Sequence, residues 1–455
     1  MRPPRLAGLL LLTALLAALP GRAEVSASEA TSWLQRYLAI DTTNPPGNEH
    51  RAVEYLAWLL HRERIPTEWL KSPEGRVSLL ARLPAENPRG GPLLLTHHMD
   101  VVPAGPGWTV APFSAEIRDG ELWGRGALDT KALGIAHLAA MIDLKRRGVP
   151  LERDVVFLAV ADEEKGGGQG MAWLVEAHPE VFEGVWAAFN EGGSGRRAAT
   201  GLLWWEVEVA QKRPLWLRLS VEGRSGHASQ YRPSSAPHTL IRALARVLDR
   251  PPTYRVTPVV RRYFQAIAPL HEGSKWRALF ADIDRVVTPS GPSPKLLPGL
   301  DRLFLDSLQV TVLAGSESIN VIPREASAEI DVRLLPDTDA DAYLAELAGM
   351  LGREVKIEVL ARAPVSAPSP TDHPAFRAIE ETLGSSAPVV PALLSGFTDS
   401  RFLRERGIPA YGVSPFDIDP LSASGVHGPD ERISVVGFER GVERMIRLVE
   451  RCARR

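Results

Sequence analysis

Short apolar segments alternate with longer segments of helical spacing along much of this chain, and this order constrains its fold more than any other feature. Residues 78–83, 92–96 and 154–161 have the apolar character of buried strands. Residues 131–147 and 170–177 have the spacing of helices. Strands that alternate with helices in this way predict an α/β layer with a mostly parallel sheet.

A different pattern begins near Lys212. Residues 215–221 alternate apolar and polar side chains, which is typical of a half-exposed strand. The elements expected after it are a helix, two strands, a helix and a strand, at residues 236–248, 307–312, 326–334, 340–351 and 355–360. This order is that of a ferredoxin-like unit, so we predict a smaller α+β domain here.

The two patterns predict an α/β domain built from both ends of the chain, with the α+β domain inserted between them. The first part of the α/β domain is expected at residues 24–211 and the second at residues 363–455, after a crossing rich in proline and serine. The inserted domain is expected at residues 212–362. Within it, residues 249–306 form a long insertion with many prolines and some helical character.

Residues 1–23 have the pattern of a secretory signal peptide. Arg2 and Arg5 precede an apolar run at residues 6–19, and a small-residue cleavage site ends at Ala23. An N-terminal membrane anchor is the alternative, but the run is shorter than the roughly 20 apolar residues that span a bilayer. We therefore expect a secreted or periplasmic protein that keeps no stable membrane anchor after cleavage.

Charge and cysteine content narrow the choice of partners and the sources of stability. The formal net charge is -2, so electrostatics gives no reason to expect nucleic acid or an anionic membrane as a partner. A small-molecule substrate is the remaining expectation. Cys452 is the only cysteine, so no intrachain disulfide can form, and stability must come from packing and metal.

Candidate metal ligands lie where the predicted strands end. His98 and Asp100 follow the strand at residues 92–96 and point to the same side of an extended segment, so one can bind a metal while the other fixes its ring. Asp129 comes just before the helix at residues 131–147, where its alternative role is that of a helix N-cap. Histidine and carboxylate side chains are ordinary ligands of zinc in proteins.

Further acidic residues follow the next strands. Glu163 and Glu164 are adjacent at the end of the strand at residues 154–161, close to a run of glycines, an arrangement that is costly for folding and favours a functional role. Glu191 follows an apolar segment, and His427 lies in a glycine-flanked loop near the C-terminus. Each residue has an alternative role in a turn, but their common placement at strand ends argues against independent coincidences.

Together these segments resemble the co-catalytic zinc exopeptidase and amidohydrolase family, which includes aminoacylases, glutamate carboxypeptidase, carnosine-type dipeptidases and succinyl-diaminopimelate desuccinylase. The matching segments are residues 98–103, 124–126, 129, 162–164, 190–193, 226–229, 320–323 and 427. The resemblance covers nearly the whole chain after residue 23. Residues 398–402 and the signal peptide resemble most closely the secreted branch that hydrolyses, and can condense, N-fatty-acyl amino acids.

The resemblance implies a zinc-exopeptidase-like catalytic domain with a central, mostly parallel sheet, and an inserted ferredoxin-like lid or dimerisation domain. It also implies two zinc ions per chain. The implied ligands are Asp129, which bridges both ions, His98 and Glu191 at one ion, and Glu164 and His427 at the other.

The resemblance assigns catalytic roles to three more residues. Glu163 is left over as the general base that removes a proton from the water shared by the metals, and Asp100 orients His98 from outside the metal ligands. His227, in the inserted domain, polarises the scissile carbonyl and stabilises the oxyanion, often from a second subunit. The alternative for His227 is a histidine in a surface loop.

The free carboxylate of the substrate is expected to meet Asn320, Arg333 and Gly396. The fork of an arginine suits a carboxylate, and backbone amides of a glycine loop can meet it as well. For Arg333 the alternative is a surface ion pair with Asp331. The insertion at residues 249–306 leaves two assemblies open, a homodimer or a single chain whose enlarged lid covers the active site.

The expected function is that of a dizinc metallo-carboxypeptidase or N-acyl-amino-acid amidohydrolase, which cleaves an amide bond next to a free carboxylate. The substrate is an N-acyl amino acid or a short peptide, and a dipeptidase of the same family is the alternative. A metal-containing binding protein without catalysis is a third hypothesis. It is disfavoured because such a protein should lose the base or the ligands, whereas Glu163 and all five ligand positions are intact.

Overall fold

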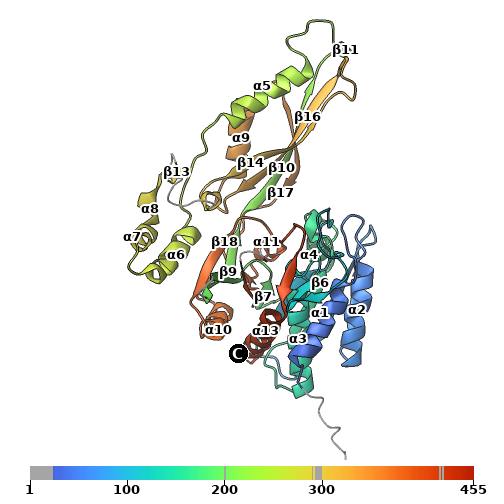
Figure 1. Ribbon diagram of the computed structural model, residues 1–455, viewed down its shortest axis with the longest axis vertical. Helices are drawn as coiled ribbons and strands as arrows, with labels where there is room; N and C mark the ends of the chain where they lie inside the picture. Colours follow the sequence, from blue (N-terminus) through green and yellow to red (C-terminus); the bar gives the residue numbers. More distant parts are fainter. Residues whose placement is uncertain are drawn as a thin grey trace, which may run out of the picture.

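The computed structural model describes residues 24–198, 201–288, 291–292, 300–419, 422 and 425–454. The signal peptide expected at residues 1–23 lies outside the described residues. Figure 1 shows two bodies, a larger one built around a broad sheet and a smaller, elongated one that extends away from it. Among the described helices, none is both long and apolar enough to cross a membrane.

The larger body is built on a sheet of ten described strands. In spatial order they are β1 (Thr67–Lys71), β2 (Val77–Leu83), β6 (Val155–Val160), β3 (Leu93–His98), β7 (Ala187–Asn190), β19 (Ala410–Gly412), β9 (Gly201–Gln211), β8 (Gly195–Ala198) and β20 (Asp417–Ile418), with β18 (Val389–Leu394) beside β9. The central strands β6, β3, β7 and β19 run parallel. The predicted α/β layer with a mostly parallel central sheet is therefore confirmed.

Helices cover both faces of this sheet, and the side chains of β3 show why. Leu93 and Leu95 pack with one group of helices, whereas Leu94 packs with the other. All of β6 is buried, as expected for a parallel strand between two helical layers. The first layer contains α1 (Ala27–Leu38), α2 (Glu49–Arg62), α3 (Lys131–Arg147), α10 (Pro374–Leu383) and α13 (Val435–Ala453), and the second contains α4 (Met171–Ala177) and α11 (Ser400–Glu405).

The smaller body is the predicted ferredoxin-like unit. Its antiparallel sheet has the order β14 (Ser307–Ala314), β16 (Glu325–Leu334), β10 (Arg213–Glu222) and β17 (Lys356–Arg362). Helices α5 (Ala236–Leu248) and α9 (Ala340–Leu351) cover one face, where Leu215, Leu217 and Leu219 of β10 are buried. At the far tip in Figure 1, β11 (Gly226–His227) pairs with β15 (Val321–Ile322).

The helical part of the insertion at residues 249–306 packs on the larger body. The apolar residues Val260 and Phe264 of its first helix are buried in the same core as the central sheet, beside β18 and β9. Tyr263 Oη donates a hydrogen bond of 2.7 Å to Glu206 Oε1 of β9. The apolar face of this first helix is thus used against this edge of the sheet, and the choice between a homodimer and a lid within one chain stays a prediction. The described helices of the insertion are α6 (Pro258–Ile267), α7 (Lys275–Ala281) and α8 (Ile283–Val286), at one side of the sheet in Figure 1.

Short elements complete the described fold. A small sheet of β4 (Ile117–Arg118), β5 (Glu121–Trp123) and β21 (Arg432–Ser434) joins the loop before α3 to a loop near the C-terminus. The single turns and remaining short strands are η1 (Glu163–Lys165), η2 (Pro179–Val181), η3 (Ala268–His271), η4 (Asp301–Leu303), β12 (Val287–Thr288) and β13 (Gly291–Pro292). The helices predicted at residues 131–147, 236–248 and 340–351 are α3, α5 and α9, with the same bounds.

Candidate metal centre

Five side chains converge at one edge of the central sheet. Strand β3 ends at His98, β6 leads into the turn that contains Glu164, and Glu191 follows β7. Because the carboxyl ends of parallel strands meet at the same edge of a sheet, these residues come together. Asp129 joins them from the loop before α3, and His427 joins them from the loop before β21.

Asp129 lies between the two histidines. Its Oδ1 is 2.9 Å from Nε2 of His98, and its Oδ2 is 3.0 Å from Nε2 of His427. Glu191 Oε1 lies 3.6 Å from Nε2 of His98, and Glu164 Oε2 lies 3.3 Å from Nε2 of His427. The structure thus gathers the five candidate ligands in two groups, one on each side of Asp129.

This set of nitrogen and oxygen donors fits divalent metal ions such as zinc. Ligand atoms of His98, Asp129 and Glu164 all lie within 4.8 Å of one another. Glu164 Oε1 is buried and has no hydrogen-bond partner among the described residues, so an ion at this place would satisfy it. Hydrogen bonds to Asp129 and Glu164 raise the pKa of His427 to about 10, so the carboxylates favour positive charge here.

Asp100 supports the cluster in a way that differs in part from the expectation. Its backbone oxygen accepts a hydrogen bond of 2.9 Å from Nδ1 of His98, which leaves Nε2 to face Asp129. Its carboxylate is 3.6 Å from the same Nδ1 and instead accepts the backbone N–H groups of Glu163 and Glu164 at 3.1 and 3.2 Å. Asp100 therefore orients His98 through its main chain and the turn η1 through its side chain.

Glu163 is buried beside the cluster. Its carboxylate lies within 4.8 Å of ligand atoms of His98 and Glu191. Burial, followed by the negative charge of Glu191, raises the pKa of Glu163 well above its ordinary value. A carboxylate of raised pKa takes up a proton readily, which suits a general base. The same position is also within reach of a metal, so a measurement of metal content has to separate the two roles.

A polar network beneath the cluster holds these loops, and the sequence patterns do not single it out. Asn44 Nδ2 donates hydrogen bonds to Asp100 Oδ2 at 2.8 Å and to Asp162 Oδ1 at 3.1 Å. Arg76 Nη1 donates to the same oxygen of Asp162 at 2.8 Å, and Arg76 also pairs with the buried Glu49. Burial alone would raise the pKa of Asp100, but its neighbours outweigh burial and lower it. Asn44 lies in a proline-containing loop, and only the folded chain shows its contact with Asp100.

The candidate substrate residues of the inserted domain lie in two separate places. His227 and Asn320 lie together at the exposed tip, where the N–H of Ala228 donates to the backbone oxygen of Asn320 at 2.9 Å. Nδ1 of His227 lies 2.8 Å from Oγ of Ser229. Figure 1 shows the tip, labelled β11, far from the strands of the larger body that carry the cluster. Within one chain, neither residue is brought to the candidate ligands.

Arg333 lies at the other end of the inserted domain, next to the larger body. Its Nε and Nη2 donate to the two oxygens of Asp331 at 2.7 Å each, which is the ion pair given as its alternative role. Its guanidinium also lies 4.5 Å from the ring centre of Phe397, the residue after Gly396. The buried Arg401, which belongs to the segment 398–402 named above, lies 4.4 Å from the same ring centre and is a further cation to which the sequence analysis assigns no role.

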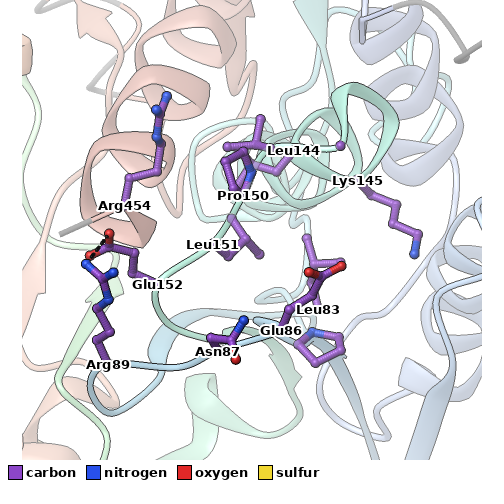
Figure 2. A pocket seen from close by; sticks show the side chains of 13 residues that line it. Leu83, Glu86, Asn87, Arg89, Leu144, Lys145, Pro150, Leu151, Glu152 and Arg454 are labelled. Carbon is purple, nitrogen blue, oxygen red and sulfur yellow. Dashed lines mark hydrogen bonds and ion pairs between the residues drawn. The ribbon is translucent and has the colours of Figure 1, made fainter.

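A separate surface hollow lies at the opposite end of α3 and is shown in Figure 2. Leu83, Leu144 and Leu151 are among its lining residues, and none of the candidate site residues lines it. Because the cluster lies before the first turn of α3 and the hollow is lined by Leu144 and Lys145 of its last turn, about 20 Å of helix separates them. The hollow also contains an exposed ion pair of 3.0 Å between Arg89 and Glu152, and it plays no part in the site.

Comparison with known families and sequences adds independent findings. The model of peptidase family M20/M25/M40 matches residues 94–451. Aminoacylase-1 of Homo sapiens is 28% identical over 425 residues, which cover 91% of this chain and 93% of that protein. A probable carboxypeptidase S-like 2 of Dictyostelium discoideum is 27% identical over 389 residues, which cover 79% of this chain and 71% of that protein.

Comparison with solved structures shows the same fold in other proteins. An M20 family metallo-carboxypeptidase from Sulfolobus solfataricus has a TM-score of 0.70 at 18% identity, covering 93% of this chain and 98% of that one. Human carnosine dipeptidase 1 has a TM-score of 0.66 at 17% identity, covering 94% of this chain and 96% of that one. Both likenesses cover the central sheet and the inserted domain together.

Proposed function

Since this chain belongs to peptidase family M20/M25/M40 and is a metal-dependent amide hydrolase, we propose that it uses two zinc ions to cleave an amide bond next to a free carboxylate. It would act as a carboxypeptidase or an N-acyl-amino-acid hydrolase. Similarity to aminoacylase-1 and to a carboxypeptidase S-like protein supports this substrate class. The observation that carries the proposal is the position of Asp129, which turns one carboxylate oxygen to His98 and the other to His427.

The proposed reaction needs a metal centre, a general base and a hydrogen-bond donor to the carbonyl oxygen. The two ions, held by His98, Asp129, Glu164, Glu191 and His427, would supply Lewis-acid chemistry, which makes water a better nucleophile and the amide carbonyl a better electrophile. Glu163 accepts a proton from the attacking water and passes it to the nitrogen of the leaving amine. His227 donates a hydrogen bond to the carbonyl oxygen as negative charge develops there.

Recognition of the free carboxylate is the part of the proposal that sets the substrate class. Arg333 offers a planar fork of N–H donors that matches a carboxylate. Its bond to Asp331 holds the guanidinium in place beside Phe397 and the loop of Gly396. Asn320 is the second proposed partner of the substrate carboxylate. In this proposal, Asn320 of one chain binds a substrate that lies in the site of another chain.

We propose that the active unit is a homodimer. His227 and Asn320 lie at the tip of the inserted domain, whereas Arg333 lies at its base, so a single chain does not bring both groups to its own cluster. In a two-fold dimer, the tip of one chain can complete the cluster of its partner. The edge strand β14 favours such pairing, because Val312 and Leu313 are 45% and 68% exposed there. We also propose that this enzyme acts in the periplasm or outside the cell, and the signal peptide pattern of residues 1–23 supports this proposal.

Product analysis of zinc-loaded protein tests the proposed substrate class. The panel contains N-acyl amino acids, the matching carboxamides and dipeptides, and the products are identified by mass spectrometry. We expect the N-acyl amino acids to be cleaved and their carboxamides to react far more slowly, because the carboxamides lack the charge that Arg333 binds. Equal rates for acid and carboxamide would contradict the proposal, and a preference for dipeptides would favour the dipeptidase alternative.

The variant Glu163→Gln separates a base from a metal ligand. We expect turnover to fall by roughly 100- to 10,000-fold while both zinc ions stay bound, because glutamine keeps the shape of the side chain but cannot accept the proton. Elemental analysis and kinetics are done on the same preparation. The matched control is Glu74→Gln, an exposed glutamate between β1 and β2, which should change neither quantity. Loss of zinc together with activity would make Glu163 a ligand.

A further inference from the structure

A second buried carboxylate, that of Glu431, lies directly behind the loop of Asp129. Glu431 is fully buried. Its Oε1 accepts hydrogen bonds from the backbone N–H groups of Leu128 at 2.7 Å and Asp129 at 3.0 Å. Its Oε2 accepts the N–H of Gly126 at 2.9 Å. One carboxylate therefore fixes the main chain of the loop at three points, including the residue that lies between the two histidines.

Arg125 extends this contact to the loop of the other histidine. The side chain of Arg125 is 1% exposed, and its Nη1 donates to Glu431 Oε2 at 2.7 Å. Its Nη2 donates to the backbone oxygen of Gly428 at 2.8 Å, directly after His427. The ring of Trp108 lies 5.1 Å from the guanidinium and covers it. Glu431 and Arg125 thus form a clamp between two loops that come from distant parts of the sequence.

Charge balance alone does not explain this arrangement. A buried ion pair is weak evidence for stability, because removing two charges from water costs about as much as their attraction returns. A glutamate that only neutralised Arg125 would not need to accept three backbone N–H groups of one loop. The three hydrogen bonds that Glu431 accepts instead fix the main chain at Asp129, from which the side chain of Asp129 extends. The guanidinium of Arg125 fixes the main chain directly after His427.

We propose that Glu431 is a positioning residue that holds Asp129 and His427 at one spacing, so that the affinity of the centre for both of its metal ions depends on this clamp. The inference rests on the two-metal centre of the proposed function. Residues that orient metal ligands without touching the metal typically contribute 10- to 100-fold to metal affinity. Glu431 does not meet the substrate or the attacking water in this proposal.

The variant Glu431→Gln tests the clamp through zinc binding. Glutamine has nearly the same size, but it offers one acceptor oxygen in place of two and leaves Arg125 without a counter-charge. Zinc affinity is measured by competition with a chelator of known affinity, and zinc content is measured after gel filtration. We expect affinity to fall by about 10- to 100-fold. Circular dichroism and the melting temperature in excess zinc report whether the variant is folded.

The matched control is the neighbouring residue Asp430. Its carboxylate accepts hydrogen bonds from the N–H and Oγ1 of Thr109, at 2.7 Å each, near the surface. Asp430→Asn therefore disturbs the same loop and removes the same charge, but it leaves the clamp intact. We expect wild-type zinc affinity for this control.

A double variant separates positioning from simple charge compensation. Arg125→Met with Glu431→Leu removes both buried charges and keeps apolar packing, which is often tolerated in place of a buried ion pair. We expect it to fold and still bind zinc weakly, and it decides the question if Glu431→Gln does not fold. Wild-type zinc affinity in the double variant, or in folded Glu431→Gln, would overturn the inference. A wild type that fails to bind two zinc ions would instead contradict the proposed function.

Discussion

Two inactive variants of this enzyme should restore each other when they are mixed. His227→Ala removes the proposed donor to the oxyanion, and Glu163→Ala removes the proposed base. Each change alone should nearly abolish turnover, because loss of one oxyanion donor costs about 100- to 1000-fold in kcat. His227 lies at the exposed tip of the inserted domain, so we expect it to serve the cluster of the partner chain.

The expected recovery follows from the geometry of a two-fold dimer. In a mixed dimer, the chain with His227→Ala keeps Glu163 and receives an intact His227 from its partner, whereas the other cluster has no base. If the chains exchange freely at equal amounts, half of the dimers are mixed and each contains one complete site. The mixture should therefore reach about a quarter of the wild-type rate per chain.

The assay compares initial rates before and after exchange of the chains. Native mass spectrometry counts the mixed dimers, and zinc analysis checks that neither variant has lost metal. The control mixes Glu163→Ala with the double variant that carries both changes, which forms mixed dimers without a complete site and should stay inactive. Mixed dimers that form but remain inactive would refute the reasoning, as would a His227→Ala variant with near-normal kcat.

Two further predictions concern the free energy of unfolding and test Gly134 and His137 of α3, with Gly349 of α9 as a comparison site. Gly134→Ala should destabilise the protein by about 1–3 kcal/mol in a denaturant titration, because the new Cβ would come within 2.3 Å of the ring of His97. Gly349→Ala should stabilise the protein by about 0.5–1 kcal/mol, because a Cβ at this position would have no neighbouring atom within 4 Å. Equal effects of the two substitutions would contradict the steric argument. Burial lowers the pKa of His137 from 6.5 to about 3, so the unfolded chain binds its proton first and stability falls as the pH drops through that window. Melting curves from pH 7 to pH 4 should therefore decline less steeply for His137→Leu than for the wild type, and parallel declines would show that His137 contributes nothing to acid sensitivity.

The candidate ligands could be located from the sequence because a simple topological rule applies to them. His98, Glu164 and Glu191 each follow an apolar segment, and parallel strands bring such positions to one edge of the sheet. The apolar pattern also predicts which segments are strands, since both faces of β6 are buried. Periodicity and strand order therefore carry most of the information about the larger body.

Other parts of the structure depend on contacts that no local pattern encodes. The apolar face of α6 is visible in the sequence, but its partner, the edge strand β18, lies far along the chain. Glu431 stands near His427 in the sequence, yet its role depends on the orientation of three backbone N–H groups in a distant loop. The role of Asp100 also depends on the folded chain, because its backbone oxygen binds His98 and its carboxylate binds the N–H of Glu163. Side-chain chemistry can be predicted in these cases, whereas the choice of partner cannot.

The position of β19 has a consequence for synthesis on the ribosome. Residues Ala410–Gly412 lie between β7 and β9, in the interior of the sheet. A nascent chain that has emerged only as far as the inserted domain therefore exposes an unpaired edge on β7. Pairing across such a long sequence separation is slow, so the chain has to wait for almost its full length before this edge is closed. Fragments that stop before β19 should aggregate or be captured by chaperones, and we expect the missing C-terminal piece, added as a separate polypeptide, to reduce this aggregation.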